Sequence, residues 1–160
     1  PGWLHMPTSA NTYDDLDLEA IISFRIFRLH AALDRQAVHI LNNVSGLRQN
    51  EWKVISFIGL GNARTSRQIA KLTHMDPAII SRTIRTLEDD GLVVTERSKD
   101  DRRVVLLSLT TAGQKKFDLT FPHMLERQRS LISSLSSGEQ QTIWKIFNKL
   151  EIATEQREFN

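Results

Sequence analysis

A single segment, residues 65–109, limits what this 160-residue chain can fold into more than any other part of it. Thr65 and Gln68 have the spacing of a capping box, which opens a first helix. Asp76 and Pro77 combine an N-cap residue with proline at the first helical position, and they open a second helix that stops at Gly91. Residues 73–75 form the turn between them, and so short a connection suits two helices that cross steeply.

The second half of the segment predicts a β-hairpin. Residues 92–95 and 104–109 are rich in β-branched and aliphatic side chains, which favours strands, and the polar run 96–103 is their connecting loop. A helix, a tight turn, a second helix and a hairpin, in this order, make a winged helix-turn-helix. Such motifs insert the second helix into the major groove of DNA, so the segment predicts a nucleic-acid partner.

The placement of charge supports this partner better than the net charge does. The formal net charge is only +2, but residues 64–87 are basic apart from Asp76, whereas residues 14–19 are acidic. On the second helix, we expect Ile80, Ile84 and Leu87 to be buried, which turns the arginines outward. A solvated charged surface without a partner is the alternative.

The residues predicted to contact DNA come from both helices and the hairpin. Arginine has a planar fork that suits guanine edges and phosphates, and a basic loop tip suits a narrow minor groove. Asp101, two residues before Arg103, is expected to orient that guanidinium through a charge-assisted hydrogen bond. The predicted DNA-binding residues are Ser66, Arg67, Ala78, Ser81, Arg82, Arg85, Arg97, Lys99, Arg102 and Arg103.

A long helix predicted over residues 16–44 favours a second subunit. It has two apolar stripes, and a helix that is apolar on more than one side must be covered on more than one side. In a chain this short a partner subunit is the expected second cover, and a large intramolecular core is the alternative. One stripe contains Ile22, Ile26, Leu29, Leu33, Ala37, Ile40 and Val44, and the other contains Ile21, Phe24, Ala31, Val38 and Leu41.

Local signals mark the remaining helices. A short helix over residues 50–60 is closed by Gly59 and Gly61. Thr110 or Thr111 caps a long helix that Pro122 is expected to kink, and Ser136 with Glu139 forms a capping box before the last helix. That last helix carries apolar residues on one face at 143, 146, 147 and 150.

These elements predict a mainly α fold with a small β-hairpin wing. Residues 1–15 are expected to be a flexible arm, with a native start at Met6. Residues 16–46 and 111–160 are predicted to form a helical dimerisation region, and residues 47–110 a DNA-binding lobe.

Over about residues 16–150, the chain resembles the multiple antibiotic resistance regulator (MarR) family of winged-helix repressors. The matching elements, in order, are Leu47 with Glu51 and Trp52, Ser81-Arg82, Leu87-Glu88, Gly91-Leu92-Val93, Asp101-Arg102-Arg103, Leu109-Thr110 with Gly113, and Leu135-Ser136 with Glu139. The resemblance implies a homodimer joined through its N- and C-terminal helices and a palindromic operator. By the same resemblance, Ser81 and Arg82 fall in the recognition helix and Arg103 matches the wing arginine held by Asp101.

Two positions depart from the family pattern. Arg48 stands where many members have a capping threonine, which leaves the start of that helix open. Thr95 stands where many members have an early wing arginine, with Arg97 two residues further on. The exact contacts of the wing therefore stay open.

The resemblance also implies an effector, because many members release DNA when a small aromatic or phenolic acid binds. Such a site needs apolar walls and a group that holds a carboxylate. We expect Arg25 to bind the carboxylate and Trp52 to stack on the ring, with Arg28, His30 and Ser56 as further candidates. Trp52 as ordinary core and Arg25 in an inter-subunit salt bridge are the alternative.

Several classes of function are excluded. The chain has no cysteine, which removes disulfides, thiolate metal sites and cysteine-based redox sensing. Its five histidines lack metal-ligand spacing, and no nucleophile or phosphate-loop motif occurs, so neither a metal, a cofactor nor an enzyme is predicted. No apolar run approaches the roughly 20 residues that span a bilayer, so a cytoplasmic protein with no membrane partner is expected.

The sequence thus predicts a ligand-responsive, homodimeric repressor of transcription. A nonspecific architectural DNA-binding protein without an effector is the main alternative. A winged helix that binds proteins instead of DNA is a second, which the basic recognition face disfavours, and a small enzyme is a third.

Overall fold

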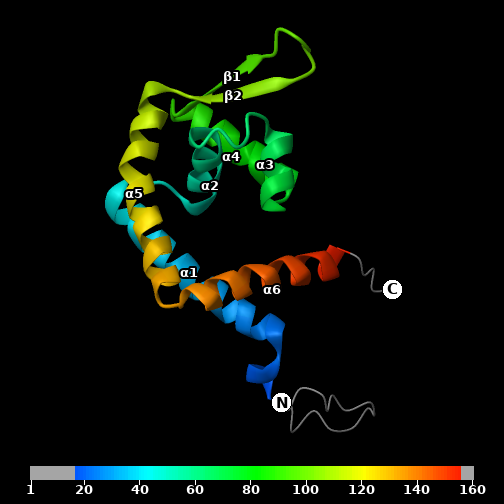
Figure 1. Ribbon diagram of the computed structural model, residues 1–160. Coiled ribbons are helices and arrows are strands. Elements are labelled where there is room, and N and C mark those ends of the chain that lie inside the picture. Colours follow the sequence, from blue (N-terminus) through cyan, green and yellow to red (C-terminus); the bar gives the residue numbers. More distant parts are fainter. Residues whose placement is uncertain (1–16, 156–160) are drawn as a thin grey trace.

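A computed structural model describes residues 17–155 of the chain, so the arm expected over residues 1–15 lies outside the described part. That part is mainly helical with a two-stranded antiparallel hairpin, which confirms the predicted fold class (Figure 1). In chain order the elements are η2 (Leu18–Ala20, a 3-10 turn), α1 (Ile22–Val44), α2 (Gln49–Gly59), α3 (Ser66–Thr73), α4 (Pro77–Asp89), β1 (Val93–Arg97), β2 (Val105–Leu109), α5 (Thr111–Ser133) and α6 (Ser137–Glu155).

The helices α2, α3 and α4 and the hairpin pack into one lobe, and α1 and α5 extend away from it (Figure 1). Val54, Ile55, Ile69, Ile80 and Leu87 are fully buried at its centre. The backbone N–H of residue 107 in β2 donates to the carbonyl of residue 64 at 2.8 Å, which ties the hairpin to the α2–α3 connection. Helix α4 is therefore held in place by its packing against α2, α3 and β1.

The hairpin is longer at its tip than the sequence predicts. Arg97 pairs with Val105 and Glu96 with Leu106, so both residues belong to β1 and not to the connecting loop. The error has a physical reason, because strand pairing is made by backbone groups and polar side chains on an exposed strand do not prevent it. The loop proper consists of residues 98–104.

Thr110 is the residue that caps α5. Its hydroxyl oxygen accepts a hydrogen bond from the backbone N–H of Gly113 at 3.0 Å and donates one to the carbonyl of Gly91 at 2.6 Å. The same side chain thus begins α5 and fastens it to the end of α4. The helix then continues unbroken past Pro122 to Ser133.

The two-sided apolar pattern of α1 is not covered within one protomer. The helix begins at Ile22, later than predicted, after Asp17 has capped the preceding 3-10 turn. Of its residues only Ala37 and Leu41 are buried, whereas Phe27 is 65 % exposed. On α6, which follows the predicted Ser136–Glu139 capping box, Trp144 is 56 % exposed. Both ends of the described chain therefore offer apolar surface to a further partner.

Candidate nucleic-acid interface

The start of α4 is fixed by local contacts. A side-chain oxygen of Asp76 accepts a hydrogen bond from the N–H of Ala78 at 2.6 Å, and Pro77 occupies the first turn, as predicted. His74 has a φ of +52°, so the chain reverses in a single left-handed residue after α3. The short turn therefore sets the angle at which α4 leaves α3.

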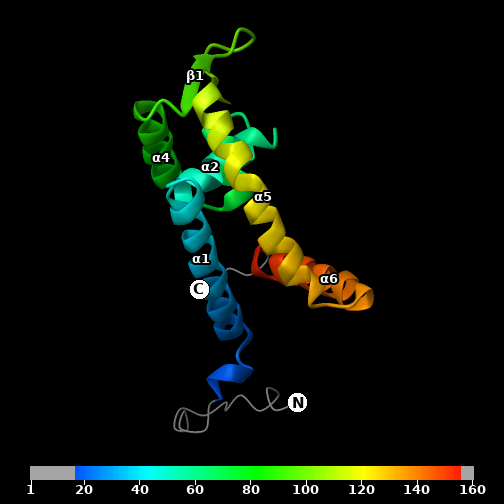
Figure 2. The same cartoon turned by 90° about the vertical axis from the view of Figure 1, so that its left-hand side faces the viewer.

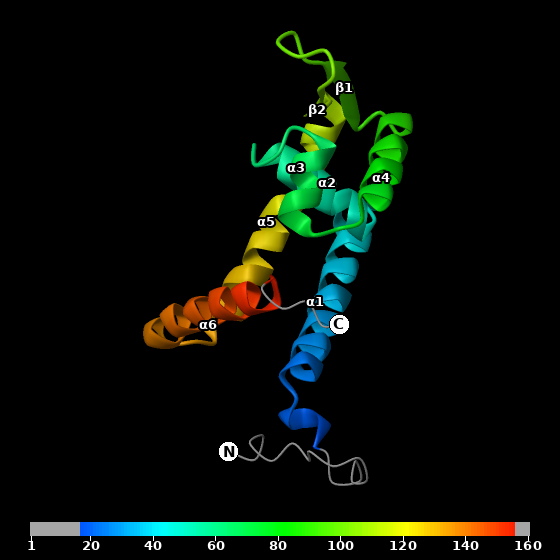
Figure 3. The ribbon, with the colours of Figure 1, turned by 90° about the vertical axis from the view of Figure 1, so that its right-hand side faces the viewer.

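The exposed side of α4 carries the polar residues predicted to meet DNA. Ile80, Ile84 and Leu87 are buried as expected. Figure 3 shows α4 along the edge of the lobe, below the hairpin. The exposed residues on this helix include Ala78, Ser81, Arg82 and Arg85, and the acids Glu88 and Asp89 are exposed at its far end.

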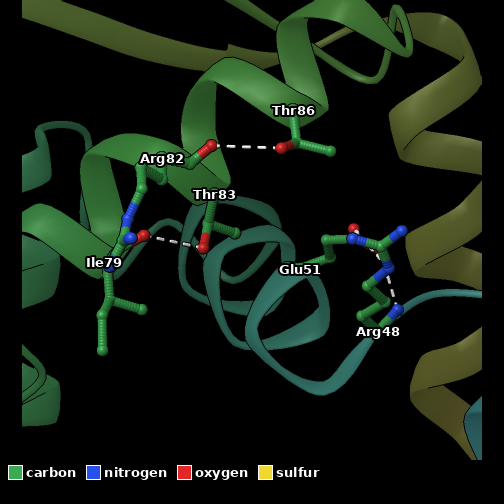
Figure 4. Close-up of polar contacts among 6 residues, drawn as sticks. All are labelled: Arg48, Glu51, Ile79, Arg82, Thr83 and Thr86. Atoms are coloured by element: carbon green, nitrogen blue, oxygen red, sulfur yellow. Dashed lines mark hydrogen bonds and ion pairs between the residues drawn. The ribbon is translucent and has the colours of Figure 1, made fainter.

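The hydroxyl groups on the flank of α4 are already used within the helix. Thr83 donates to the carbonyl of Ile79 at 2.8 Å and Thr86 to that of Arg82 at 3.2 Å (Figure 4). Ser81, by contrast, has no hydrogen bond recorded for its side chain within the described residues, so its hydroxyl group is available to a ligand.

The start of α3 lies beside the start of α4. Ser66, Arg67 and Ser81 line one small hollow of about 190 Å³ between the two helices. Ser66 and Arg67 are exposed, and their helix is opened by Thr65, whose hydroxyl oxygen accepts from the N–H of Gln68 at 3.2 Å. In a standard capping box the Gln68 side chain would accept a hydrogen bond from the backbone N–H of Thr65. Here it accepts from the N–H of the preceding residue, 64. The structure thus brings the predicted contacts of α3 and α4 together.

The wing is ordered by hydrogen bonds of its own backbone and short side chains. Asp101 accepts from the backbone N–H of Arg103 at 2.9 Å, and Arg97 donates to the carbonyl of Arg102 at 3.2 Å. Within residues 17–155 no ion pair joins the side chains of Asp101 and Arg103, so the contact found differs from the expected one. Asp101 shapes the loop, which carries the exposed side chains of Lys99, Arg102 and Arg103, and Arg97 is exposed at the adjoining end of β1.

Thr95 explains one departure from the family pattern. Its hydroxyl group donates to a carboxylate oxygen of Glu88 at 2.6 Å, which links β1 to the last turn of α4. An acid on the far end of the recognition helix is thereby engaged within the protein. Thr95, which stands where many members of the family have an arginine, therefore makes a contact within the protein.

Arg48 is a further candidate that sequence reasoning did not include among the DNA contacts. It precedes α2, where its backbone N–H donates to Glu51 at 2.7 Å. A full capping box would also need the Arg48 side chain to accept a hydrogen bond from the backbone N–H of Glu51. A guanidinium group has no acceptor atom, so this second bond cannot form. The side chain is 83 % exposed and lines a crevice of about 560 Å³ that α2 forms with α4, opposite Arg82 (Figure 4). The signal that could have identified it is an arginine at the position where many members of the family have threonine.

The predicted effector residues do not meet within one protomer. Gln49 of α2 donates to Asp34 of α1 at 2.7 Å, which marks where the two helices cross. Arg25 is exposed and precedes Asp34 by nine residues, or roughly 13 Å of helix. Trp52 stacks on Phe117 with ring centroids 6.1 Å apart, as part of the lobe's packing.

The other effector candidates also have partners of their own. Arg28 is paired with Glu19 at 2.5 Å, and His30 lies 3.4 Å from Asp34. The hydroxyl group of Ser56 donates to the carbonyl of residue 53 at 2.9 Å. A carboxylate site that uses Arg25 and Trp52 together is therefore not formed within the described chain.

Two further features of the described residues bear on the class of protein. None of the helices between residues 17 and 155 is long and apolar enough to cross a membrane. In the same part of the chain, no three histidine, aspartate or glutamate side chains are grouped as a metal ion would need.

A helical lobe with a steep two-helix turn, an exposed basic second helix and an ordered basic wing defines a winged-helix transcriptional regulator. Comparison with known proteins agrees. A family model described as MarR family matches residues 45–104. Within this class, the chain is similar to the MarR family over that lobe.

Relatives and solved structures extend the likeness beyond the lobe. The uncharacterized HTH-type transcriptional regulator YwaE of Bacillus subtilis is 26 % identical over 141 residues, which are 86 % of this chain and 81 % of that protein. A MarR/EmrR family regulator from Acinetobacter sp. ADP1 has the same fold, with a TM-score of 0.81, 20 % identity and coverage of 89 % of this chain and 100 % of the other. The MepR–DNA complex of S. aureus gives a TM-score of 0.76 at 19 % identity, over 83 % and 98 % of the two chains.

Proposed function

We propose that this protein is a homodimeric repressor that binds a palindromic operator and releases it when a small aromatic or phenolic acid binds. The observation that carries the DNA-binding part is the exposed face of α4. Ser81, Arg82 and Arg85 face outward there, next to Ser66 and Arg67 of α3. Ser81 and Arg82 suit base edges, whereas Ser66 and Arg67 suit the phosphate backbone.

The wing and the relatives support the same proposal. Lys99, Arg102 and Arg103 are exposed on an ordered loop, which suits a minor groove or the phosphates that flank it. The MepR structure is a complex with DNA, and the relative YetL of Bacillus subtilis is described as a transcriptional repressor. We therefore also propose a cytoplasmic location.

The exposed apolar surface of α1 and α6 supports the proposed dimer. Leaving side chains such as Phe27 and Trp144 in water costs about 25 cal/mol for each Å² of apolar area. A second copy of the chain covers both helices in a symmetric way, because the same patch then faces itself. Two copies of α4, related by that symmetry, read two half-sites of a palindrome.

An effector acts by changing the distance between the two copies of α4. The loss of operator-binding free energy cannot exceed the difference in the ligand's binding free energy between two conformations of the dimer. These are the conformation that fits the operator and one in which the two α4 helices are wrongly spaced. We place the ligand between Trp52 of one protomer and Arg25 of its partner, because the two residues lie too far apart within one chain. Structures of similar fold support the ligand class: NadR, at a TM-score of 0.71 and 22 % identity, is in complex with 4-hydroxyphenylacetate.

Operator binding is tested by fluorescence anisotropy with the DNA upstream of the protein's own gene. A specific regulator binds that duplex at least about 1000-fold more tightly than a scrambled duplex at the same salt concentration. Equal binding to both duplexes would instead establish the architectural alternative. No binding to either duplex would favour the alternative in which the winged helix binds proteins instead of DNA.

The effector is tested by calorimetry with a panel of aromatic acids, followed by anisotropy in the presence of each acid that binds. We expect an acid that binds to lower operator affinity and the Arg25→Ala variant to lose that acid. Undiminished binding by Arg25→Ala would remove Arg25 from the site. Binding without any change in operator affinity would contradict the effector mechanism.

A further inference from the structure

A second polar crevice lies away from the DNA-binding surface, between α1 and α5. Figure 2 shows these two helices diverging below the lobe. The crevice has a volume of about 440 Å³, within the range of small-ligand sites. Its polar lining is Gln36 and His39 of α1, Arg127 and Ser130 of α5, and Ser134 directly after α5.

Arg127 makes this crevice unusual. One terminal nitrogen of its guanidinium donates to the carbonyl of Leu33 at 2.8 Å, which holds the cation between the two helices. Its Nε atom is enclosed by protein and has no hydrogen-bond partner. Within residues 17–155 the side chain takes part in no ion pair, and no carboxylate lines the crevice. A half-buried cation is therefore left without a counter-charge, which is costly unless an anion supplies it.

The neighbours of Arg127 suit an anion with a small apolar body. The Asn43 amide lies 3.0 Å from Nε2 of His39, and when it donates there the Nδ1–H of the neutral ring remains as a donor. Ser130 adds a hydroxyl group, and Ile40 and Leu131 add apolar wall. A single cation with neutral donors matches a monoanion such as a carboxylate, which an arginine binds through charge-assisted hydrogen bonds.

We propose that this crevice is a carboxylate-binding site with Arg127 as its cation. The carboxylate comes either from a free small acid or from an acidic side chain of a second copy of the chain, and the chemistry of the site is the same in both cases. None of Arg25, Arg28, His30, Trp52 and Ser56 lines this crevice. The site therefore stands apart from the proposed effector site and does not depend on it.

The test follows the Nε–H resonance of Arg127 by NMR in the full-length protein, assigned through its loss in Arg127→Gln. The probe is benzoate, and neutral benzamide is the matched control ligand. We expect benzoate to shift this resonance in a saturable way, benzamide to leave it unchanged, and Arg127→Gln to weaken benzoate binding about 10- to 100-fold, as loss of a charge-assisted bond implies. Arg129→Gln, an exposed arginine on the same helix, is the control and should retain the response.

A second arm identifies the source of the carboxylate. If benzoate does not bind, but Arg127→Gln dissociates the dimer more readily and Arg127→Lys restores it, the carboxylate belongs to the second copy. The proposal is overturned if benzoate leaves the resonance unchanged and Arg127→Gln dimerises as the unaltered protein does. The response to benzoate must persist in Arg25→Ala, so failure of the effector proposal and failure of this one give different results.

Discussion

At the scale of single residues, two glycines near helix starts differ in whether a larger side chain could replace them. Gly113 lies in the first turn of α5, where a Cβ atom would overlap the backbone carbonyl of Leu92. Gly138 lies in the first turn of α6 with nothing within 4 Å of the same position. Only the first glycine is required by packing, because it lets α5 begin directly against the end of the recognition helix.

We therefore expect Gly113→Ala to destabilise the protein by about 1–3 kcal/mol or more, since the obstacle is backbone and cannot rotate away. Gly138→Ala is the matched control and should raise stability by about 0.5–1 kcal/mol, because alanine favours a helix. Urea unfolding of both variants measures the difference. Equal stability of the two variants would show that α5 shifts freely against residue 92.

Arg82 is the residue for which we expect the largest effect on the recognition of DNA sequence. It is exposed on α4, and its Nε donates only to the carbonyl of Ala78, at 3.3 Å, a bond that DNA can replace. We expect Arg82→Ala to lower operator affinity by about 1–3 kcal/mol and to relax the preference for one base pair in each half-site. Anisotropy with single-substituted operators tests this, with Arg129→Ala as a control far from the surface of α4. Uniform weakening across all operators would make Arg82 a phosphate contact.

At the scale of elements, the start of α2 extends the surface presented by α4. The crevice between them has Arg48 on one wall and Arg82 on the other, and both cations are exposed (Figure 4). We expect Arg48→Gln to weaken binding to specific and random duplexes alike and to reduce the salt dependence by about one counterion. Affinities measured at several salt concentrations test it. A change in sequence preference without a change in salt slope would contradict a phosphate contact.

The cap of α6 gives a prediction about pH. Hydrogen bonds from the Ser136 hydroxyl and backbone groups hold the pKa of Glu139 below its usual range. Since the folded pKa is lowered, the contribution of this cap to stability is present above the usual glutamate pKa and is lost as pH falls through the lowered one. We expect Ser136→Ala to move the pKa of Glu139 upward, toward its usual value, in an NMR titration. An unchanged titration would show that the cap is not formed in solution.

The same scale shows what the sequence could predict. Helix α4 was predicted from end to end because Asp76, Pro77 and Gly91 act through their own backbone neighbours. The end of β1 was predicted wrongly, because the pairing of Arg97 with Val105 is made by backbone groups across a loop. The sequence places the effector candidates on two helices, but it does not reveal where those helices cross. The bond between Gln49 and Asp34 fixes that crossing and separates Arg25 from Trp52.

At the scale of the whole molecule, α1 and α5 connect the exposed apolar surface of α1 to the lobe that carries α4. Lys116 of α5 donates to the carbonyl of Ser45, just after the end of α1, and Arg127 donates to the carbonyl of Leu33. The two helices are thus joined at both ends of their shared length. In the proposed dimer, a second copy that covers α1 is therefore connected to the lobe through both helices.

Dimerisation and operator binding should therefore be lost together. Phe27 is 65 % exposed on α1, and Phe27→Glu places a charge where the proposed interface excludes water. We expect this variant to sediment as a monomer with its lobe still folded, and its affinity to fall to that of a half-site, because two half-sites are no longer held at a fixed distance. Leu60→Glu is the matched control, since Leu60 is 48 % exposed on the lobe outside that interface, and it should remain a dimer. A Phe27→Glu protein that still dimerises, or a monomer that retains full operator affinity, would contradict the proposed assembly.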